Sequence, residues 1–311
     1  MNYVIPNDDG KKFRKKIFLR LLDSSNLGYV DGATDYCLLL PFAEDCMLDT
    51  GDRLWLAFLY GMSYSCTTSI RFFTAFPNPD RISPKGLKKF WKTEKSSLWF
   101  NPDKKYLKNN DQVVSAIHSI YKNSKGDFEN YMVENLKKGF DHMYRIIKRD
   151  WRFFGPHGAY LFFDAVYGLC PELYSDPTNL DWKNCGKTVS EGMAHLLYLD
   201  NCVETKEHDF DRYNKNVNIL VEKSGQPKVI IESTLCAFRK MFKQTRYHGY
   251  YADRMLEECS EVEKLMSSLG FDIWDYRKRT IPEALRGEVN GWSGIRTEKC
   301  RLFVEKGKID E

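Results

Sequence analysis

The segment 51–77, GDRLWLAFLYGMSYSCTTSIRFFTAFP, constrains the fold more than any other part of the chain. It is apolar over most of its length, and we expect one long helix that is capped by Asp52 and ends before Pro77. A helix that is apolar on nearly every side must be surrounded by other elements. The segment therefore predicts a protein built around this helix, in which three polar-tipped side chains either pack in the core or line a cavity: Tyr60, Tyr64 and Arg71.

Other segments carry apolar residues at the spacing of amphipathic helices. We expect helices at 10–23, 111–123 and 128–149, and an almost wholly apolar helix after the turn 155–158. Residues 208–222 fit a helix or, in NVNILV, a strand, and we favour the helix. The expected fold class is mainly α, a single large helical domain with room for a small β-hairpin within 210–232.

Composition bounds the class of protein but not its function. The chain has 311 residues, of which 42% are hydrophobic and 29% charged, so it can bury a sizeable core. No apolar run approaches the ~20 residues of a membrane span and no signal peptide is recognisable, so we expect a cytoplasmic protein without a membrane partner. The net charge of +4 is too small to establish a nucleic-acid partner.

Neither the cysteines nor the histidines form a metal-binding pattern. The nine cysteines are scattered singly without a CxxC pair, and the six histidines include no pair at i, i+4. We therefore expect reduced thiols, no tightly held metal and no tightly bound cofactor.

The segment 185–193, CGKTVSEGM, contains the Gly-Lys-Thr of nucleotide-binding loops. Such a loop needs a further glycine at the position that Asp181 occupies, and a buried strand before it. We therefore reject an NTPase. The residues instead predict a helix with Thr188 as N-cap and Glu191 completing a capping box, and the free amides and Lys187 at its start suit a phosphate.

The segment 83–108 combines eight lysines with interleaved aromatic residues. It is open to two interpretations: a groove that neutralises phosphates and stacks bases, or a solvated lysine face over an ordinary aromatic core. In the first interpretation the DNA-binding residues are Lys88, Lys89, Lys92, Lys104 and Lys105.

Two acids and one basic cluster suggest a pocket. Asp164 is the one acid on the apolar helix after 158, and Glu232 ends an apolar run just before a Ser/Thr cap, at an expected junction of elements. In RYHGYYADR, 246–254, two arginines bracket tyrosines and an acid. Arginine binds phosphate oxygens in a bidentate manner and tyrosine stacks on a base, although a surface ion-pair network has the same composition.

Taken in order, five blocks of the sequence resemble the phage α-glutamyl/putrescinyl thymine pyrophosphorylase family, also called amino acid:DNA transferases. The blocks are RLWLAFLYGMSYSCTTSIRFFTAFP, KFWKTEKSSLWFNPDKKYLK, GAYLFFDAVYGL, CGKTVSEGM and IESTLCAFRKMFKQTRYHGYYADR, and they span roughly residues 50 to 260. The motifs are diffuse, and no single one is diagnostic.

The resemblance implies a helical fold related to helix-hairpin-helix DNA glycosylases, and an enzyme of thymine hypermodification in bacteriophage DNA. Such an enzyme displaces pyrophosphate from pyrophosphorylated 5-hydroxymethyluracil with the amine of an amino acid or polyamine. The implied partners are double-stranded DNA, the free amine and a 5-hydroxymethyluracil DNA kinase, in the cytoplasm of the bacterial host. The segment 186–188 resembles the phosphate-holding hairpin of that fold, but Thr188 replaces its second glycine.

The resemblance also implies roles for individual residues, with a divalent ion as an optional aid. Pyrophosphate would be bound by Lys187, Thr188, Arg246, Arg254 and Lys240. The proton of the amine would go to Glu232, Asp164 or Asp253, and the flipped base would stack on Tyr247 and Tyr250. We expect a C-terminal basic extension over 277–311, a helical transferase domain over 46–276 and an N-terminal segment over 1–45.

Two alternatives remain open from the sequence. The same fold could serve a DNA glycosylase or lyase, for which Asp209 stands at roughly the right distance after the hairpin. A non-enzymatic protein that binds DNA and recruits the kinase would share the helical pattern.

Overall fold

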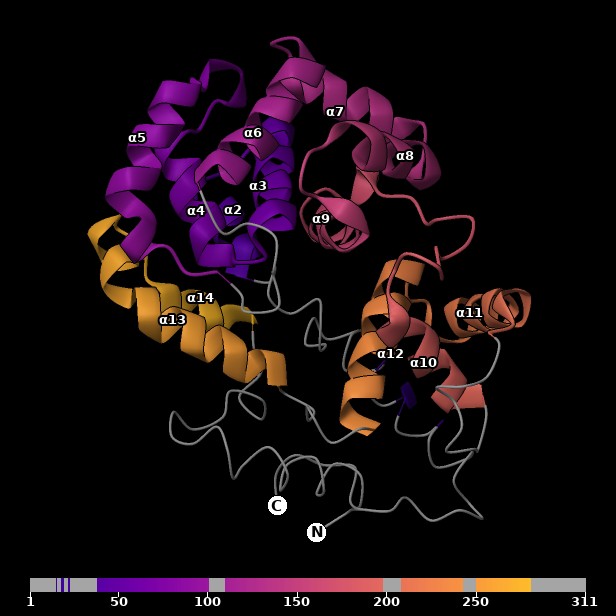
Figure 1. Ribbon diagram of the computed structural model, residues 1–311. Helices are drawn as coiled ribbons and strands as arrows, with labels where there is room; N and C mark the ends of the chain where they lie inside the picture. Colours follow the sequence, from indigo (N-terminus) through magenta and orange to yellow (C-terminus); the bar gives the residue numbers. More distant parts are fainter. Residues whose placement is uncertain are drawn as a thin grey trace. The chain divides into compact units, whose positions relative to one another are not determined.

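The computed structural model describes residues 38–100, 110–197, 208–242 and 250–280, together with residues 15, 18, 19 and 22. All regular secondary structure in these ranges is helical, and no strand occurs among them (Figure 1). The mainly α fold class is therefore confirmed. Most of the helix expected at 10–23 lies outside the described residues, and the likeness to helix-hairpin-helix glycosylases stays a prediction.

The chain divides into two compact units. The first unit comprises Met1–Thr34, Asn179–Leu256 and Ile281–Glu311, and the second comprises Asp35–Thr178 and Glu257–Thr280. The expected domain boundaries at 45/46 and 276/277 remain predictions.

The second unit contains most of the helices. Its elements are α2 (Leu39–Asp45), α3 (Thr50–Ser63), α4 (Cys66–Ala75), η2 (Pro79–Arg81), α5 (Pro84–Glu94), η3 (Lys95–Ser97), α6 (Asn110–Ser124), α7 (Phe128–Lys137), α8 (Phe140–Asp150), α9 (Gly155–Leu169), η4 (Pro171–Leu173) and α14 (Ile273–Thr280). The first unit contains α10 (Lys187–Leu197), α11 (Phe210–Ser224) and α12 (Lys228–Phe242). The long helix α13 (Tyr250–Ser268) begins in the first unit and continues in the second.

Helix α3 is the centre of the second unit, as its composition predicts. It packs most extensively on α9 and also contacts α4 and α7 (Figure 1). Its residues from Leu54 to Ser63 are all buried. Gly61 permits the close approach to α9, because a methyl group there would lie 2.9 Å from the Cβ of Phe162 and 3.0 Å from the carbonyl oxygen of Gly158.

The expectation of a single helix over 51–77 is wrong. The chain leaves the helix at Tyr64, whose φ of 53° is left-handed, and α4 starts anew two residues later. Ser65 caps α4 by accepting a hydrogen bond from the amide of Thr68, so the Ser-Tyr-Ser sequence supplies a local alternative to the helical ladder. The cap of α3 is Asp49, which accepts from the amide of Asp52 at 2.9 Å.

The polar-tipped residues of this segment pack rather than line a cavity. Tyr60 and Tyr64 are buried, and their rings meet edge to face. Arg71 pairs with Glu94 at 3.0 Å and lies over the ring of Phe90.

The helix expected over 128–149 is also divided. Gly139 separates α7 from α8 with a φ of 94°, a conformation that favours glycine, and the amide of Phe140 donates to the hydroxyl of Ser175 at 2.8 Å. By contrast, the helix expected at 111–123 is confirmed by α6, and the preference for a helix at 208–222 is confirmed by α11. Asp209 and Gly225 mark the two ends of α11 as N-cap and left-handed C-cap.

A buried acid of α13 holds the start of α4. The carboxylate of Glu258 accepts hydrogen bonds from the hydroxyl of Ser65 at 2.5 Å, the amide of Thr67 at 2.9 Å and the hydroxyl of Thr67. Negative charge at a helix N-terminus is favourable because the helix dipole is positive there. This contact joins two segments of the second unit that are 191 residues apart in sequence.

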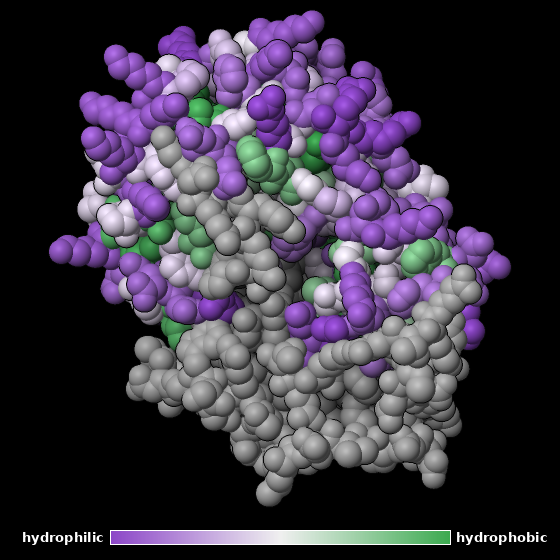
Figure 2. Space-filling model, viewed as in Figure 1, coloured by the Kyte–Doolittle hydropathy of each residue, from purple (hydrophilic) through white to green (hydrophobic). Residues whose placement is uncertain are grey.

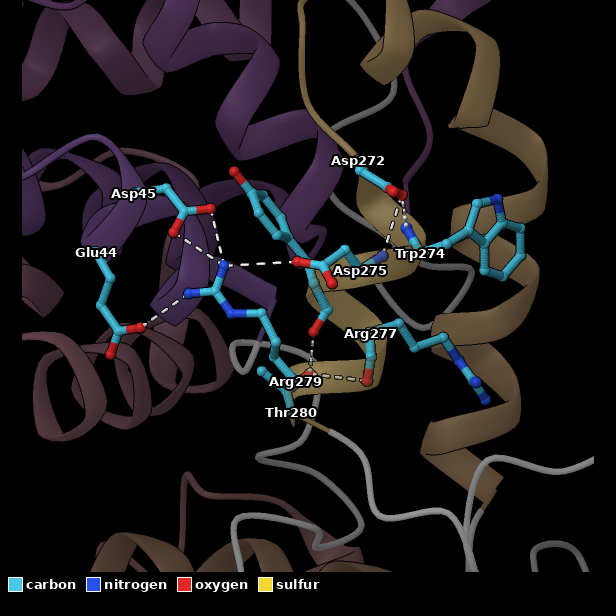
Figure 3. A network of polar contacts seen from close by, with 9 residues as sticks. Glu44, Asp45, Asp272, Trp274, Asp275, Arg277, Arg279 and Thr280 are labelled. Atoms are coloured by element: carbon cyan, nitrogen blue, oxygen red, sulfur yellow. Dashed lines mark hydrogen bonds and ion pairs between the residues drawn. The ribbon is translucent and has the colours of Figure 1, made fainter.

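Helix α14 is fastened to α2 by a more exposed network (Figure 3). The Arg279 guanidinium contacts both carboxylate oxygens of Asp45, at 2.9 and 2.8 Å, and Glu44 at 3.2 Å. Asp272 caps α14 by accepting hydrogen bonds from the amides of Trp274 and Asp275. These contacts make Arg279 a structural partner of α2 within the second unit.

Candidate active site on α10 and α12

Glu232 lies within α12 and not at a junction of elements, so that part of the sequence interpretation is wrong. The helix begins at Lys228, after Pro227, and the hydroxyl of Thr234 donates back to the carbonyl of Ile230 at 2.7 Å. Thr234 is therefore an interior helical residue and not a cap. Glu232 stands in the second turn of α12 with its side chain buried.

Burial changes the acidity of Glu232. Loss of solvent raises the pKa of this carboxyl from an ordinary value near 4.5 to about 8, and a hydrogen bond with Ser233 opposes the rise. The carboxyl is therefore mostly protonated at neutral pH and ionises in the mildly alkaline range. A group that titrates there suits proton transfer, because general acid and base catalysis is most efficient when the pKa is near the working pH.

Two thiols are electrostatic neighbours of this carboxyl. Cys185, which is half-buried just before α10, has its pKa raised far above the ordinary value first by burial and then by the charges of Glu232 and Asp181. Cys236, one turn along α12, adds to the same shift. A thiol with a raised pKa stays protonated, so its acidity does not favour Cys185 as a nucleophile.

The α10 and α12 backbones approach very closely. A methyl group at Gly192 would lie only 2.2 Å from the carbonyl oxygen of Leu235, so only glycine fits at this crossing. The imidazole of His195 is buried further along α10. The close crossing fixes the position of Glu232 relative to α10, as proton transfer requires.

The start of α10 differs from the expected capping box. The helix begins at Lys187 after Gly186, whose φ of 109° favours glycine, so Thr188 lies inside the first turn. Residues 181–184 form a turn and not a strand, in keeping with the rejection of a nucleotide-binding loop.

Glu191 has a different role from the predicted one. Its fully buried carboxylate pairs with the Arg239 guanidinium at 2.5 Å and with the Lys187 ammonium at 3.3 Å. Lys187 is 71% exposed at its side chain, so it reaches solvent while part of its charge is used within the protein. The pair with Arg239 ties α10 to α12 and was not predicted from the sequence.

Most of the other predicted site residues also fall in the first unit. Lys240 is half-buried in the last turn of α12, and Arg254 is buried on α13. Tyr250 and Asp253 lie on the same helix, but their side chains are outside the described residues, as are Arg246 and Tyr247 altogether. Asp164 is buried on α9 and belongs to the second unit, unlike Glu232.

Three aromatic residues of the lysine-rich segment have packing contacts in the structure. Trp91 is buried against Phe100, and Phe90 packs against Phe72 and Phe76. Lys88, Lys89 and Lys92 are exposed on α5, with Lys88 3.6 Å from Asp111. Lys104 and Lys105 lie outside the described residues. Helix α5 thus offers a cationic face, and both interpretations of the segment stay open.

Asp209, the acid of the glycosylase alternative, has a structural contact. Its carboxylate accepts a hydrogen bond from the amide of Arg212 at 3.0 Å and caps α11.

Searches of the described ranges reveal neither a metal-binding group nor a membrane span. No cluster of three or more metal-ligating side chains occurs there, and no helix there is long and apolar enough to cross a bilayer. The cysteines in the described part of the chain, which include Cys46, Cys66 and Cys170, are not joined in disulfides. On the face seen in Figure 2 the described surface is mostly hydrophilic, with hydrophobic residues in small separate groups.

The chain was compared with protein-family models, curated proteins and solved structures, and none of them matches.

Proposed function

We propose that the chain is a DNA base-modifying transferase that joins the amine of an amino acid or polyamine to the activated methyl carbon of a DNA thymine. The proposal combines the family resemblance of the sequence with one structural observation, the buried Glu232 carboxyl whose pKa is raised to about 8. The alternatives are a DNA glycosylase and a DNA-binding partner of a kinase.

The reaction needs a proton acceptor. The neutral amine attacks the exocyclic methylene, a C–N bond forms, and the C–O bond to pyrophosphate breaks with its electron pair leaving on the pyrophosphate. The nitrogen then carries one proton too many, and the Glu232 carboxylate accepts it. A buried carboxyl is a stronger base than an exposed one, because burial favours its neutral form.

Positive charge near the site supports binding of the leaving group. Lys187 has an exposed side chain at the start of α10, and Lys240 lies at the end of α12. Glu191 neutralises part of the charge of Lys187, so we assign Lys187 an auxiliary role in binding pyrophosphate.

The test uses duplex DNA that carries pyrophosphorylated 5-hydroxymethyluracil, the purified full chain and a mixture of amino acids and polyamines. Nucleoside digestion and mass spectrometry are expected to show a new amine-bearing thymidine together with released pyrophosphate. The rate should increase as the pH rises through about 8, because the carboxylate form of Glu232 is the base. Glu232→Gln should abolish this product, whereas Glu222→Gln, an exposed acid on α11, should not.

Two other outcomes would replace the proposal. Free base or abasic sites would indicate the glycosylase, and loss of that activity in Asp209→Asn would then identify its acid, since asparagine preserves the helix cap. Tight DNA binding without any chemical change would indicate the accessory protein.

A further inference from the structure

Side-chain hydrogen bonds hold the turn between α8 and α9 against α6. The amide of Asn123 donates to the carbonyl of Asp150 at 3.3 Å. Two residues on, the backbone amide of Arg152 donates to the hydroxyl of Ser119 at 3.1 Å, and its guanidinium to that of Ser115 at 3.3 Å. The turn therefore runs antiparallel to α6, and α6, α7 and α8 lie side by side (Figure 1).

Phe153 lies at the end of this turn, partly exposed to solvent and in a strained backbone conformation. Its φ of 62° lies in the left-handed region, which costs a bulky L-residue about 1–2 kcal/mol. Its neighbours Trp151 and Phe154 are buried at 4% and 3% exposure, whereas Phe153 is 42% exposed. The Phe153 ring thus gains less from burial than the rings of its two neighbours do. An outlier of this kind suggests a functional reason for presenting the ring to solvent.

Helix α6 presents two more rings next to the same turn. His118 and Tyr121 are exposed, and their rings are stacked with centroids 6.0 Å apart and planes inclined by 22°. They occupy the turns of α6 that also carry Ser115 and Ser119, the residues that hold Arg152. Tyr121 and Phe153 are two of only four exposed large hydrophobic residues in the described part of the chain.

Cations lie on the same two elements as these rings. Lys122 and Lys125 are exposed at the end of α6, and Arg152 is exposed in the turn. The nearby acid Asp150 is already paired with Arg149 through two contacts of 2.7 Å. Flat rings among positive charges match nucleobases joined by phosphates, whereas the centre of a protein interface is depleted of charge.

We propose that this surface, the α6 ledge, defined as His118, Tyr121, Lys122, Lys125, Arg152 and Phe153, binds an unpaired stretch of a DNA strand. The rings stack on bases and the cations neutralise phosphates. The inference rests on the proposed function only for the choice of DNA, since an enzyme that acts on a base must open the duplex.

The experiment measures binding of the full chain to a fluorescein-labelled, unmodified single-stranded oligothymidylate by anisotropy. The double variant Tyr121→Ala/Phe153→Ala should weaken this binding about 10- to 100-fold, which corresponds to loss of one or two stacked bases. Ile219→Ala, which removes a 44% exposed side chain from α11 in the other unit, is the matched control and should bind like the wild type.

Two further variants distinguish the contribution of the Phe153 ring to affinity from the effects of backbone strain and of the lysine charges. Phe153→Gly accepts the left-handed φ, so it should lose affinity while unfolding at the same or a higher temperature than the wild type. Lys122→Gln/Lys125→Gln should reduce the dependence of affinity on salt, which the ring variants should leave unchanged.

Equal affinity of wild type and Tyr121→Ala/Phe153→Ala for the single strand would overturn the ledge proposal, and so would binding of a protein at these rings without any affinity for the oligonucleotide. The readout needs no modified base and no catalysis. Loss of the transferase reaction with intact strand binding would therefore refute the proposed function alone, and intact transferase activity without strand binding would refute the ledge alone.

Discussion

Replacing Glu232 by glutamine tests the raised pKa directly through stability. A carboxyl whose pKa is about 8 in the folded protein and near 4.5 in the unfolded chain binds its proton more tightly when folded. The stability that it contributes is fully present below about pH 4.5 and is lost as the pH rises through about 8. Glutamine has nearly the same shape and never ionises, so Glu232→Gln removes this dependence.

The magnitude follows from the shift. The pKa difference of about 3.5 between the two states corresponds to about 5 kcal/mol over the whole pH range, and about 2.5 kcal/mol is expected between pH 5 and pH 7. The free energy of unfolding of wild type and variant should be measured by urea denaturation at several pH values. The difference between the two proteins should shift in favour of Glu232→Gln by this amount as the pH rises.

The control is Glu222→Gln, which changes an exposed carboxyl on α11 in the same unit. Its free energy of unfolding should depend on pH in the same way as that of the wild type. A stability difference between wild type and Glu232→Gln that is constant from pH 5 to pH 8.5 would refute the reasoning. In that case the pKa of Glu232 would not be raised by folding, and Glu232 would no longer be the candidate base.

Further substitutions test the contacts that shape the two units. Gly192→Ala should lower the free energy of unfolding by about 2–4 kcal/mol in urea denaturation, because the new methyl group would lie 2.2 Å from a carbonyl oxygen of α12. An unchanged free energy of unfolding would mean that α10 and α12 can move apart at little cost. Glu258→Gln should cost about 2–3 kcal/mol, because it removes the charge that holds the amide and hydroxyl of Thr67, whereas the exposed Glu261→Gln should change little. Arg279→Ala should cost less than about 1 kcal/mol and still less at high salt in thermal denaturation, because its network is exposed; a larger loss would contradict that view.

The helical class and the central position of 51–77 were predictable because they depend on composition over many residues. The ends of helices were not, because they depend on single hydrogen bonds. Apolar spacing continues through Tyr64 and Gly139, yet Ser65 caps a new helix at the first point and a left-handed glycine interrupts the chain at the second. Tertiary contacts stabilise these interruptions and cannot be predicted from the local sequence pattern; an example is the hydrogen bond that the Ser65 hydroxyl donates to Glu258.

Glu232 was selected from the sequence for a reason that the structure corrects. It was expected at a junction before a Ser/Thr cap, but it is an interior helical residue that is buried by the crossing of α12 with α10. A signal for that crossing was present in Gly192, because glycine inside a helix marks close backbone approach. The partner of Glu191 could not be predicted, since Arg239 is 48 residues away and spacing alone does not reveal which helices meet.

The two buried acids of α10 and α12 have opposite electrostatic settings, and this contrast identifies the one that suits proton transfer. Glu191 has Arg239 and Lys187 against its carboxylate, and both cations favour its charged form. A proton placed on Glu191 would break two ion pairs in a buried place, so it is poorly suited to exchange protons during a reaction. Glu232 is shifted chiefly by burial, which favours its neutral form, and a hydrogen bond with Ser233 opposes that shift. Of these two acids, Glu232 is therefore the one that can cycle between its protonated and ionised forms near neutral pH while the helix crossing that positions it stays intact.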